Sequence, residues 1–508
     1  MKSTILLILT LLLIISGCST SSSQMETSSA KDTLTVVRLS DATKLDPHFI
    51  TDISSANILY QKVYETLVVP DLDMKPQPGL AKEWEQIDDV TWEFVLRQGV
   101  YFHDGMKFNA EAVKATFERL LDPETASPQA EKLGMIDEIE VIDEYTVRFH
   151  LSAAYAPLLS ILSASEGSII SPKALSENPK KLWEHPVGTG PFVFDYWKAG
   201  QEISLKKNEE YWGDKPKINQ VVFKVVPEDT TRLAMIETGE AHVNDQVPIT
   251  EIERIEASET LNLYRADGLG IEFLGFNVQK APFDQLNVRK AITQAIDRKA
   301  VLEGVFQNSG MLANSPMSPK VFGYSDDVKP YEYDLEKAKA LLQEAGLEGL
   351  KVTITTNDRK ERINVAEVVQ SQLKKIGIEA EVEVLEWGAY IEALNNGEHE
   401  MFVGGWGNAT GDGDYNQYNV FHSSSHGGAG NHTYYHNPEV DRIIEDARKE
   451  IDEETRRSLY EQAMKLEMED AAMIPLRYYE HLAVYHKDVE GIVISPVNYI
   501  LLNDITIK

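Results

Sequence analysis

Residues 351–405 decide the fold class of this chain, and they read KVTITTNDRKERINVAEVVQSQLKKIGIEAEVEVLEWGAYIEALNNGEHEMFVGG. Short runs rich in Val, Ile and Thr alternate with segments whose apolar residues recur every three or four positions. Runs of the first kind are typical of strands, and segments of the second kind are typical of helices. This alternation predicts a βαβαβ unit with parallel strand pairing, and therefore an α/β fold. The predicted strands are 351–356, 378–385 and 401–405, and the predicted helices are 362–376 and 390–394.

The loops after the first and third of these strands are the first places to expect a ligand. In open parallel sheets, ligands bind beyond the carboxyl ends of the strands. The first loop carries Arg359 and Arg362, and an arginine there could contact a ligand carboxylate in a bidentate manner, beside the amides of a helix N-terminus. A solvated first helical turn is the plainer interpretation of both residues. Arg38, after the first strand of the folded part, is a weaker candidate for the opposite side of the site.

The composition is that of a folded and strongly acidic protein. Of the 508 residues, 43% are hydrophobic, and 81 Asp and Glu against 49 Lys and Arg give a formal net charge of −32. Nucleic acid demands a basic surface, so this balance argues against a nucleic-acid partner. The single cysteine, Cys18, excludes an intrachain disulfide and any site that needs two cysteines.

The N-terminus has the layout of an export signal. Residues 1–17 contain one early lysine and an apolar run at 5–15, which is too short to span a hydrocarbon core of ~30 Å comfortably. The run leads into ISGC at 15–18, which resembles the lipobox of bacterial lipoproteins. That resemblance implies lipid on the sulfur of Cys18, followed by a flexible Ser- and Thr-rich tether over 18–32. An uncleaved signal anchor is the alternative.

Segments along the rest of the chain resemble the peptide and nickel class (family 5) of extracellular solute-binding proteins, which feed ABC importers. The longest matching stretch runs from Gly79 to Arg119 and contains GLAKEW, TWEF, FHDG and FNAEAV in that order. These segments follow family order over nearly all of the mature chain, so the resemblance is specific. Further matches are LDPH at 45–48, YETL at 64–67, PVGTGPF at 186–192, NEEYW at 208–212, PFD at 282–284 and VRKAI at 288–292.

The resemblance implies a two-lobed, periplasmic-binding-protein-like α/β fold of type II, in the large peptide-binding class, with an extra subdomain in lobe I. Two crossing segments join the lobes, which close around a ligand by hinge motion. The expected boundaries are 33–75, 186–270 and 475–508 for the core of lobe I, 76–185 for the extra subdomain and 271–474 for lobe II.

The same resemblance points to residues 405–415, GWGNATGDGDY, as the loop that grips the amino terminus of a peptide. A peptide is a zwitterion, so its ammonium needs a carboxylate and its carboxylate needs an arginine or a helix N-terminus. Some related dipeptide and oligopeptide binders place an aspartate three residues after the Trp, where this chain has Ala409. The nearest acids are Asp412 and Asp414, whose alternative role is an ordinary Asp-Gly turn. The expected ligand-binding residues of both loops are Trp406, Asn408, Thr410, Asp412, Asp414, Tyr415, Arg359 and Arg362.

We therefore expect a binding lipoprotein that captures dipeptides or oligopeptides, with glutathione as a further candidate, and delivers them to the membrane subunits of an ABC permease. The protein is expected to be a monomer outside the cytoplasmic membrane, held there by lipid on Cys18. No cofactor, metal or enzymatic activity is expected.

Two other functions stay open from the sequence. The first is the binding of nickel or a chelated metal in the same fold, because imidazole suits such metals and four histidines lie close together in the sequence. These residues are His422, His426, His432 and His436. The second is a secreted hydrolase, against which the mature sequence shows no Gly-x-Ser-x-Gly elbow, no His-Glu-x-x-His motif and no thiol nucleophile.

Overall fold

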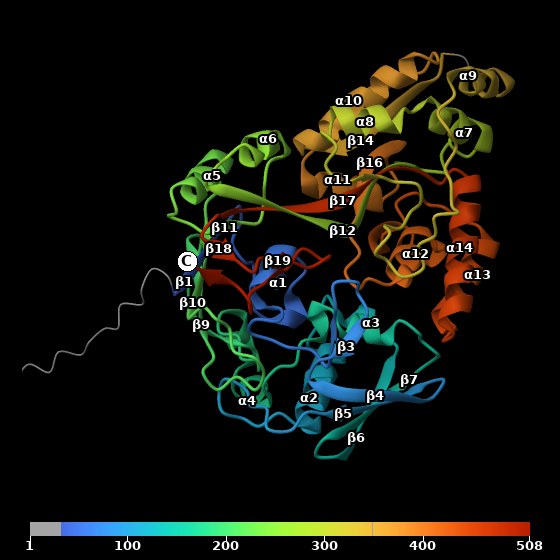
Figure 1. Ribbon diagram of the computed structural model, residues 1–508. Coiled ribbons are helices and arrows are strands. Elements are labelled where there is room, and N and C mark those ends of the chain that lie inside the picture. The colour runs from blue at the N-terminus through green and yellow to red at the C-terminus, as the bar shows by residue number, and fades with distance from the viewer. Residues whose placement is uncertain (1–31, 348) are drawn as a thin grey trace, which may run out of the picture.

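The computed structural model describes residues 32–347 and 349–508, so Cys18, the export signal and nearly all of the expected tether lie outside the described residues. Two α/β lobes face one another, and long strands run between them (Figure 1). A smaller antiparallel subdomain extends lobe I at the bottom of that view. The expectation of a two-lobed α/β fold is confirmed. Below, lobe I and lobe II denote the ranges given above.

The predicted βαβαβ unit forms the sheet of lobe II. Strand β14 (Lys351–Asn357) lies between β15 (Glu379–Leu385) and β16 (Met401–Trp406) and pairs in parallel with both. Helices α10 (Lys360–Lys374) and α11 (Trp387–Asn395) connect them, and α10 begins two residues earlier than the apolar pattern predicts. The parallel order brings the ends of β14 and β16 to the same edge of the sheet, so the two candidate loops lie close together.

Two long strands cross between the lobes. Strand β12 (Leu261–Phe276) pairs with β16 in lobe II and runs antiparallel to β17 (Met473–His486) along most of its length. Strand β17 then pairs with β11 (Val243–Asn244), which belongs to the sheet of lobe I. One sheet therefore passes through both lobes, and a change of angle between the lobes must bend or twist β12 and β17.

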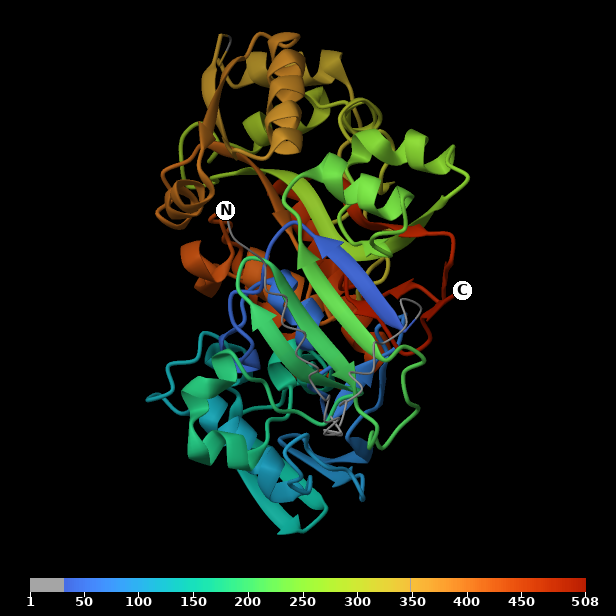
Figure 2. The same ribbon diagram turned by 90° about the vertical axis from the view of Figure 1, so that its left-hand side faces the viewer.

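The sheet of lobe I continues from β11 into β1 (Thr33–Arg38), β10 (Gln220–Val225), β9 (Glu202–Lys207) and β8 (Phe192–Lys198). Strand β1 is parallel to its two neighbours, β11 and β10. From β10 outward, β9 runs antiparallel to β10, and β8 runs antiparallel to β9. Figure 2 shows blue β1 beside the green strands of this sheet.

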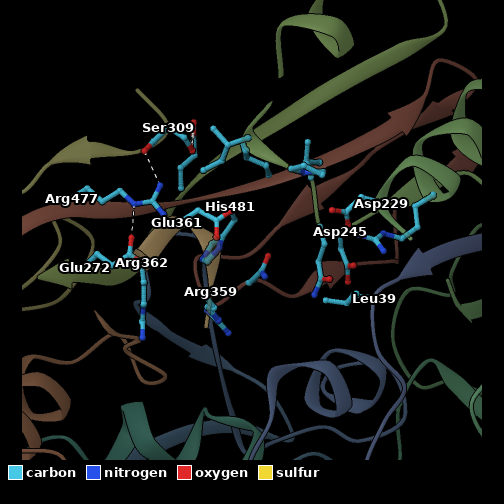
Figure 3. Close-up of a pocket in the computed structure, with 18 residues that line it drawn as sticks. Leu39, Asp229, Asp245, Glu272, Ser309, Arg359, Glu361, Arg362, Arg477 and His481 are labelled. Carbon is cyan, nitrogen blue, oxygen red and sulfur yellow. Dashed lines mark hydrogen bonds and ion pairs between the residues drawn. The ribbon is translucent and has the colours of Figure 1, made fainter. Parts of the chain in front are cut away.

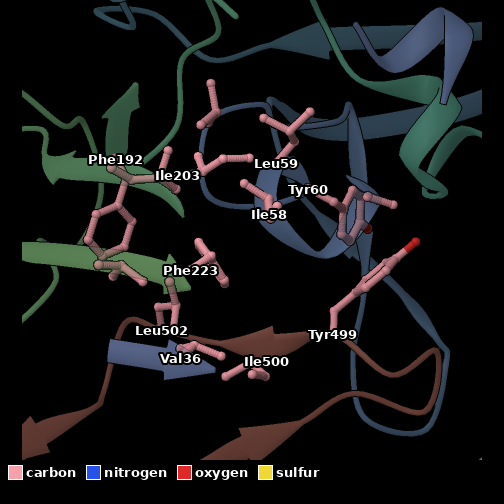
Figure 4. Close-up of a cluster of buried hydrophobic side chains, with 14 of the residues drawn as sticks. Val36, Ile58, Leu59, Tyr60, Phe192, Ile203, Phe223, Tyr499, Ile500 and Leu502 are labelled. Atoms are coloured by element: carbon pink, nitrogen blue, oxygen red, sulfur yellow. The ribbon is translucent and has the colours of Figure 1, made fainter. Parts of the chain in front are cut away.

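The core of lobe I combines residues that are far apart in the sequence. Val36 and Phe223 come from the sheet, Tyr60 follows helix α1 (Ile53–Leu59), and Ile500 comes from the end of the chain (Figure 4). All four are buried. Burial of each such side chain contributes roughly 1.5–3 kcal/mol, so the C-terminal segment helps to hold lobe I together.

The extra subdomain is an antiparallel sheet in the order β4-β5-β7-β6, covered by α2 (Ala110–Leu121). In β5 (Thr91–Leu96) the three apolar side chains that alternate along the strand are buried. The other strands are β4 (Ala81–Asp88), β6 (Ile136–Asp143) and β7 (Thr146–Leu151).

Three further helices of lobe II follow the loop at 405–415 in the sequence, and the first of them begins within it. They are α12 (Gly413–Phe421), α13 (Pro438–Lys449) and α14 (Glu453–Glu469).

Within residues 32–347 and 349–508, no helix combines the length and the apolar character needed to cross a membrane. The remaining helices of five residues or more are α3 (Leu158–Leu162), α4 (Pro172–Glu177), α5 (Asp229–Glu237), α6 (Ile252–Glu256), α7 (Leu286–Ala295), α8 (Arg298–Gly304) and α9 (Leu335–Glu344).

Candidate functional site

Of the cavities lined by both lobes, three share lining residues and form one cleft. The arginine cavity, named for Arg359 and Arg362 in its wall, has a volume of about 380 Å³. The central cavity measures about 280 Å³ and shares His481 of β17 with the arginine cavity. The outer cavity measures about 690 Å³ and shares Lys132 and Tyr415 with the central one. The cleft thus runs from the arginines past the crossing strands to the extra subdomain.

Both lobes build the arginine cavity. Leu39 and Asp245 line it from lobe I, and Arg359 and Arg362 line it from lobe II (Figure 3). The two arginines stand at the start of α10, directly after β14, as the sequence predicts for this loop. Arg38 lines none of the three cavities; its guanidinium bonds to Ser54 O at 2.8 Å.

Arg362 is almost completely buried, with 6% of its surface exposed. Its Nε lies 3.6 Å from Glu272 Oε1, and the other oxygen of Glu272 accepts a hydrogen bond from Arg477 at 2.8 Å. Burial by itself would lower the pKa of Arg362, but Tyr479 and Glu272 outweigh it and raise the pKa. One carboxylate is therefore shared by two guanidinium groups, which leaves donors on both of them for an anionic ligand group.

Arg359 differs from Arg362 because it is exposed at the N-cap of α10. Its guanidinium carbon lies 5.9 Å from the ring centre of Trp387, and among the described residues it has no ion pair. An arginine in this position can reach a ligand carboxylate without first breaking a salt bridge.

Gly405, near the end of β16, leaves room for the side chains of Tyr479 and Arg362. A Cβ atom there would collide with Tyr479 Oη and lie 2.8 Å from Arg362 Nη2. A larger residue before the Trp of this loop would therefore displace the ends of the Tyr479 and Arg362 side chains.

Asn408 and Thr410 organise the loop itself. Asn408 Oδ1 accepts from the backbone N–H groups of Thr410 and Gly411 at 2.9 and 2.6 Å, and its Nδ2 donates to Asp412 O at 2.7 Å. Asn408 lines the central cavity, but Thr410 lines none of the three cavities. Both side chains thus hold the shape of the loop, and their predicted contact with a ligand stays a prediction.

Asp412 is held inside lobe II by Arg456. The two residues form a bidentate pair, with Arg456 Nη1 at 2.8 Å from Oδ2 and Nη2 at 2.5 Å from Oδ1. Asp412 also caps α12, because Oδ1 accepts from the N–H of Asp414 at 2.9 Å. Only 3% of its surface is exposed, so this carboxylate is already fully engaged.

Asp414 connects the lobes. Tyr155 of the extra subdomain donates to Oδ2 at 3.1 Å, and Arg448 Nε of α13 lies 2.9 Å from Oδ1. Burial raises the pKa of Asp414, although Arg448 acts in the opposite direction. The residue lines the outer cavity, where it serves as a direct contact between the two halves of the molecule.

Trp406 and Tyr415 form an aromatic wall of the cleft. Their ring centres are 5.6 Å apart, and both line the outer cavity. Opposite them in lobe I, Lys132 forms an ion pair with the buried Glu166 at 2.9 Å, and its ammonium lies 5.8 Å from the centre of the Tyr415 ring. This pair is placed where the central cavity opens into the outer one.

The four histidines of the nickel hypothesis have separate environments. His422 stacks on Tyr418 at 4.5 Å, and burial lowers the pKa of His432 to about 4. In the described part of the chain, no group of three or more His, Cys, Asp or Glu side chains could hold a metal ion. Their polar neighbours are Ser424 for His422, Tyr435 O for His426, Asn395 for His432 and Asp441 for His436.

Several residues of the cleft were not anticipated from the sequence. Tyr479 and His481 lie in the middle of β17, Lys132 and Glu166 belong to the extra subdomain, and Asp245 follows β11. None of them lies in a loop after a strand of the βαβαβ unit, where the sequence predicts ligand contacts. A crossing strand shared by both lobes is the feature that could have pointed to Tyr479 and His481.

Known proteins share this chain's sequence and fold. The family model for bacterial extracellular solute-binding proteins, family 5, matches residues 75–428. The chain is 32% identical to the dipeptide-binding protein of Escherichia coli K12 over 449 residues, which cover 83% of this chain and 84% of that protein. It is 30% identical to heme-binding protein A of Haemophilus influenzae over 526 residues, 96% of each.

A solved structure agrees with these relatives. The ABC transporter-associated periplasmic binding protein of Helicobacter pylori, in complex with the peptide STSA, superimposes with a TM-score of 0.81 and 32% identity. The match covers 94% of this chain and 99% of that one. The chain therefore belongs to the bacterial extracellular solute-binding proteins of family 5, the extracytoplasmic binding proteins of ABC importers.

Proposed function

We propose that this protein captures short peptides between its lobes and hands them to the permease subunits of an ABC importer. The observation that carries the proposal is the arginine cavity, where Arg359 and the buried Arg362 line a space of about 380 Å³ enclosed by both lobes. A ligand carboxylate would bind there, with Trp406 and Tyr415 as apolar walls further along the cleft. Names of relatives support a peptide ligand, one being a dipeptide-binding protein.

Capture depends on the hinge. A ligand that contacts Arg362 of lobe II and the opposite wall of lobe I favours the arrangement in which both contacts exist together. Strands β12 and β17 are the segments that would bend, because they carry the sheet from one lobe to the other. The permease then receives the protein with its ligand enclosed.

Calorimetric titration tests this function. The free-acid dipeptide Ala-Leu should bind, whereas its C-terminal amide should bind at least tenfold more weakly, because a bond to a charged group is lost. The double variant Arg359→Ala/Arg362→Gln should lose this preference. Arg442→Ala, which removes an exposed arginine paired with Asp446, is the matched control and should behave as the unmodified protein.

Other ligands of this family belong in the same experiment. Glutathione, hemin and Ni²⁺ are titrated beside di-, tri- and tetrapeptides. Binding of hemin or Ni²⁺ with no signal from any peptide would refute the peptide function and leave only the general role as a binding protein.

We further propose that lipid on Cys18 holds the protein at the outer face of the cytoplasmic membrane. The sequence ISGC at 15–18 supports the anchor, and the family supports the compartment.

A further inference from the structure

We propose that Asp245 of lobe I, and not an acid of residues 405–415, receives the ammonium group of the ligand. This inference rests on the proposed peptide function and deepens it. Ammonium and carboxylate would then both be bound in the arginine cavity, one from each lobe. The substrate class is a short zwitterion, such as a dipeptide with a free amino terminus.

The acids of the loop at 405–415 already have partners. Asp412 is bound in a bidentate manner by Arg456. Asp414 Oδ2 accepts from Tyr155; its Oδ1 makes no hydrogen bond among the described residues, but Arg448 Nε lies 2.9 Å from it and pairs with its charge. An ammonium group would have to displace a guanidinium from either of them, at the cost of leaving a buried charge unpaired.

Asp245 is buried but incompletely satisfied. Only 6% of its surface is exposed, and it lines the arginine cavity (Figure 3). Its Oδ2 accepts from Asn57 Nδ2 at 3.3 Å and lies 3.6 Å from Arg38 Nη2. Its Oδ1 has no hydrogen-bond partner within residues 32–347 and 349–508. A buried carboxylate oxygen without a partner is unfavourable, so a donor supplied by the ligand would be bound strongly.

The other buried or half-buried acids of this cavity do not offer such an oxygen. Glu272 is shared by Arg362 and Arg477, and Glu480 accepts from Arg265 at 3.0 Å and from Ser309 at 3.0 Å. Asp229 and Glu361 also line the cavity, but both are exposed to solvent, where an ion pair is worth little.

Two cations, Arg38 and Lys62, already lie near Asp245 and reduce the attraction that it exerts on an incoming ammonium group. Arg38 Nη2 lies 3.6 Å from Oδ2, whereas Oδ1 makes no hydrogen bond within the part of the chain that the structure describes. Lys62, fully buried beside Asn57, is the second cation of this cluster. Burial, and next the charge of Arg38, lower the pKa of Lys62 to about 7, so it carries only part of its charge near neutral pH.

A comparison of free and acetylated ligands tests the assignment. Ala-Leu and N-acetyl-Ala-Leu are titrated by calorimetry against the full-length protein and against Asp245→Asn, Asp414→Asn and the surface control Asp446→Asn. In the unmodified protein, acetylation should weaken binding by about 30-fold or more, as expected for the loss of one partner of a buried charge pair. Asp245→Asn should reduce this ratio to near one, whereas Asp414→Asn and Asp446→Asn should preserve it.

The outcomes separate this inference from the function on which it rests. A ratio unchanged in Asp245→Asn, or abolished in Asp414→Asn, overturns the assignment while peptide binding stands. Failure of both ligands to bind the unmodified protein overturns the peptide function as well. If Asp245→Asn unfolds, Asp245→Glu keeps the charge and displaces it by one methylene; it should weaken binding of Ala-Leu and leave the acetylated ligand unaffected, and equal effects on both would refute the assignment.

Discussion

Replacement of Asp412 by asparagine should destabilise lobe II while leaving ligand recognition intact. The family pattern makes the loop at 405–415 look like an amine clamp, and Asp412 is one of its two acids. In the structure its carboxylate instead holds Arg456, which also donates to Ala447 O at 3.0 Å and Tyr460 Oη at 2.9 Å. Asp412→Asn keeps the shape of the side chain and removes the charge, so it leaves the Arg456 guanidinium buried without its counter-ion.

The size of the effect follows from burial. Asp412 is 3% exposed and Arg456 is 5% exposed. Breaking a buried ion pair by removing one partner costs about 3–5 kcal/mol. At about 2–4 °C of melting temperature per kcal/mol for a unit of about 200 residues, the transition of lobe II should fall by roughly 6–20 °C.

Differential scanning calorimetry at pH 7 measures this shift, with three companion variants. Arg456→Met should destabilise by a similar amount, because it leaves the carboxylate unpaired. Asp412→Asn/Arg456→Met should recover much of the loss, since two uncharged partners leave no buried charge. Asp446→Asn, which breaks an exposed pair with Arg442, should shift the transition by less than about 2 °C.

Affinity measurements decide between the structural role and a ligand role. Titration of each folded variant with the best peptide should give dissociation constants within about threefold of the unmodified protein, a difference of about 0.6 kcal/mol. The reasoning is refuted if Asp412→Asn melts within about 2 °C of the unmodified protein and loses more than tenfold in peptide affinity.

Three further predictions concern other sites. The folded-state pKa of Lys62 is about 7, below the ordinary value of 10.5, so the unfolded chain holds an extra proton between these pH values. Stability should rise with pH across this window by up to about 1.4 kcal/mol per unit, and Lys62→Met should flatten the rise measured by urea unfolding. Tyr155→Phe removes the bond to Asp414 and should weaken ligand affinity about tenfold, whereas Tyr101→Phe, at an exposed tyrosine, should not; equal affinities would contradict the contact's role. Cys18→Ser should move the protein from the membrane fraction to the soluble fraction and abolish fatty-acid labelling, and persistent labelling would exclude this attachment point.

The sheet of lobe II could be predicted from the sequence because its signals are local. The strand at 351–356 and the helix after it each show their own period within about ten residues. The strand lies where the pattern placed it, and the helix begins two residues earlier. The position of Arg359 and Arg362 followed from the same reasoning, because a loop after a parallel strand lies at the ligand edge of the sheet. Local periodicity thus identified the edge of the sheet at which the two candidate loops meet.

The partners of the candidate acids could not be predicted in this way. Arg456 is 44 positions from Asp412, and Tyr155 is 259 positions from Asp414. A sequence shows which residues carry charge, but an acid becomes available to a ligand only if the fold leaves its oxygens unpaired. Asp245 was overlooked for the same reason, since nothing in its local sequence indicates that one of its oxygens lacks a partner.

Direct contacts between the lobes set the conditions for ligand capture. Tyr155 binds Asp414, the N–H of Ala156 donates to Arg448 O at 2.8 Å, and Lys320 Nζ donates to Leu72 O at 3.0 Å. Each such bond contributes about 0.5–1.5 kcal/mol, and more where a charge takes part. A difference of 1.4 kcal/mol corresponds to a factor of ten in a conformational equilibrium. A few of these bonds can therefore shift the equilibrium between the open and closed forms, and with it the part of the ligand's binding free energy that is spent on closing the lobes. The extra subdomain provides Tyr155 and Ala156, so it takes part in closure as well as in enclosing the cleft, and variants at its contacts should change affinity without touching the arginine cavity.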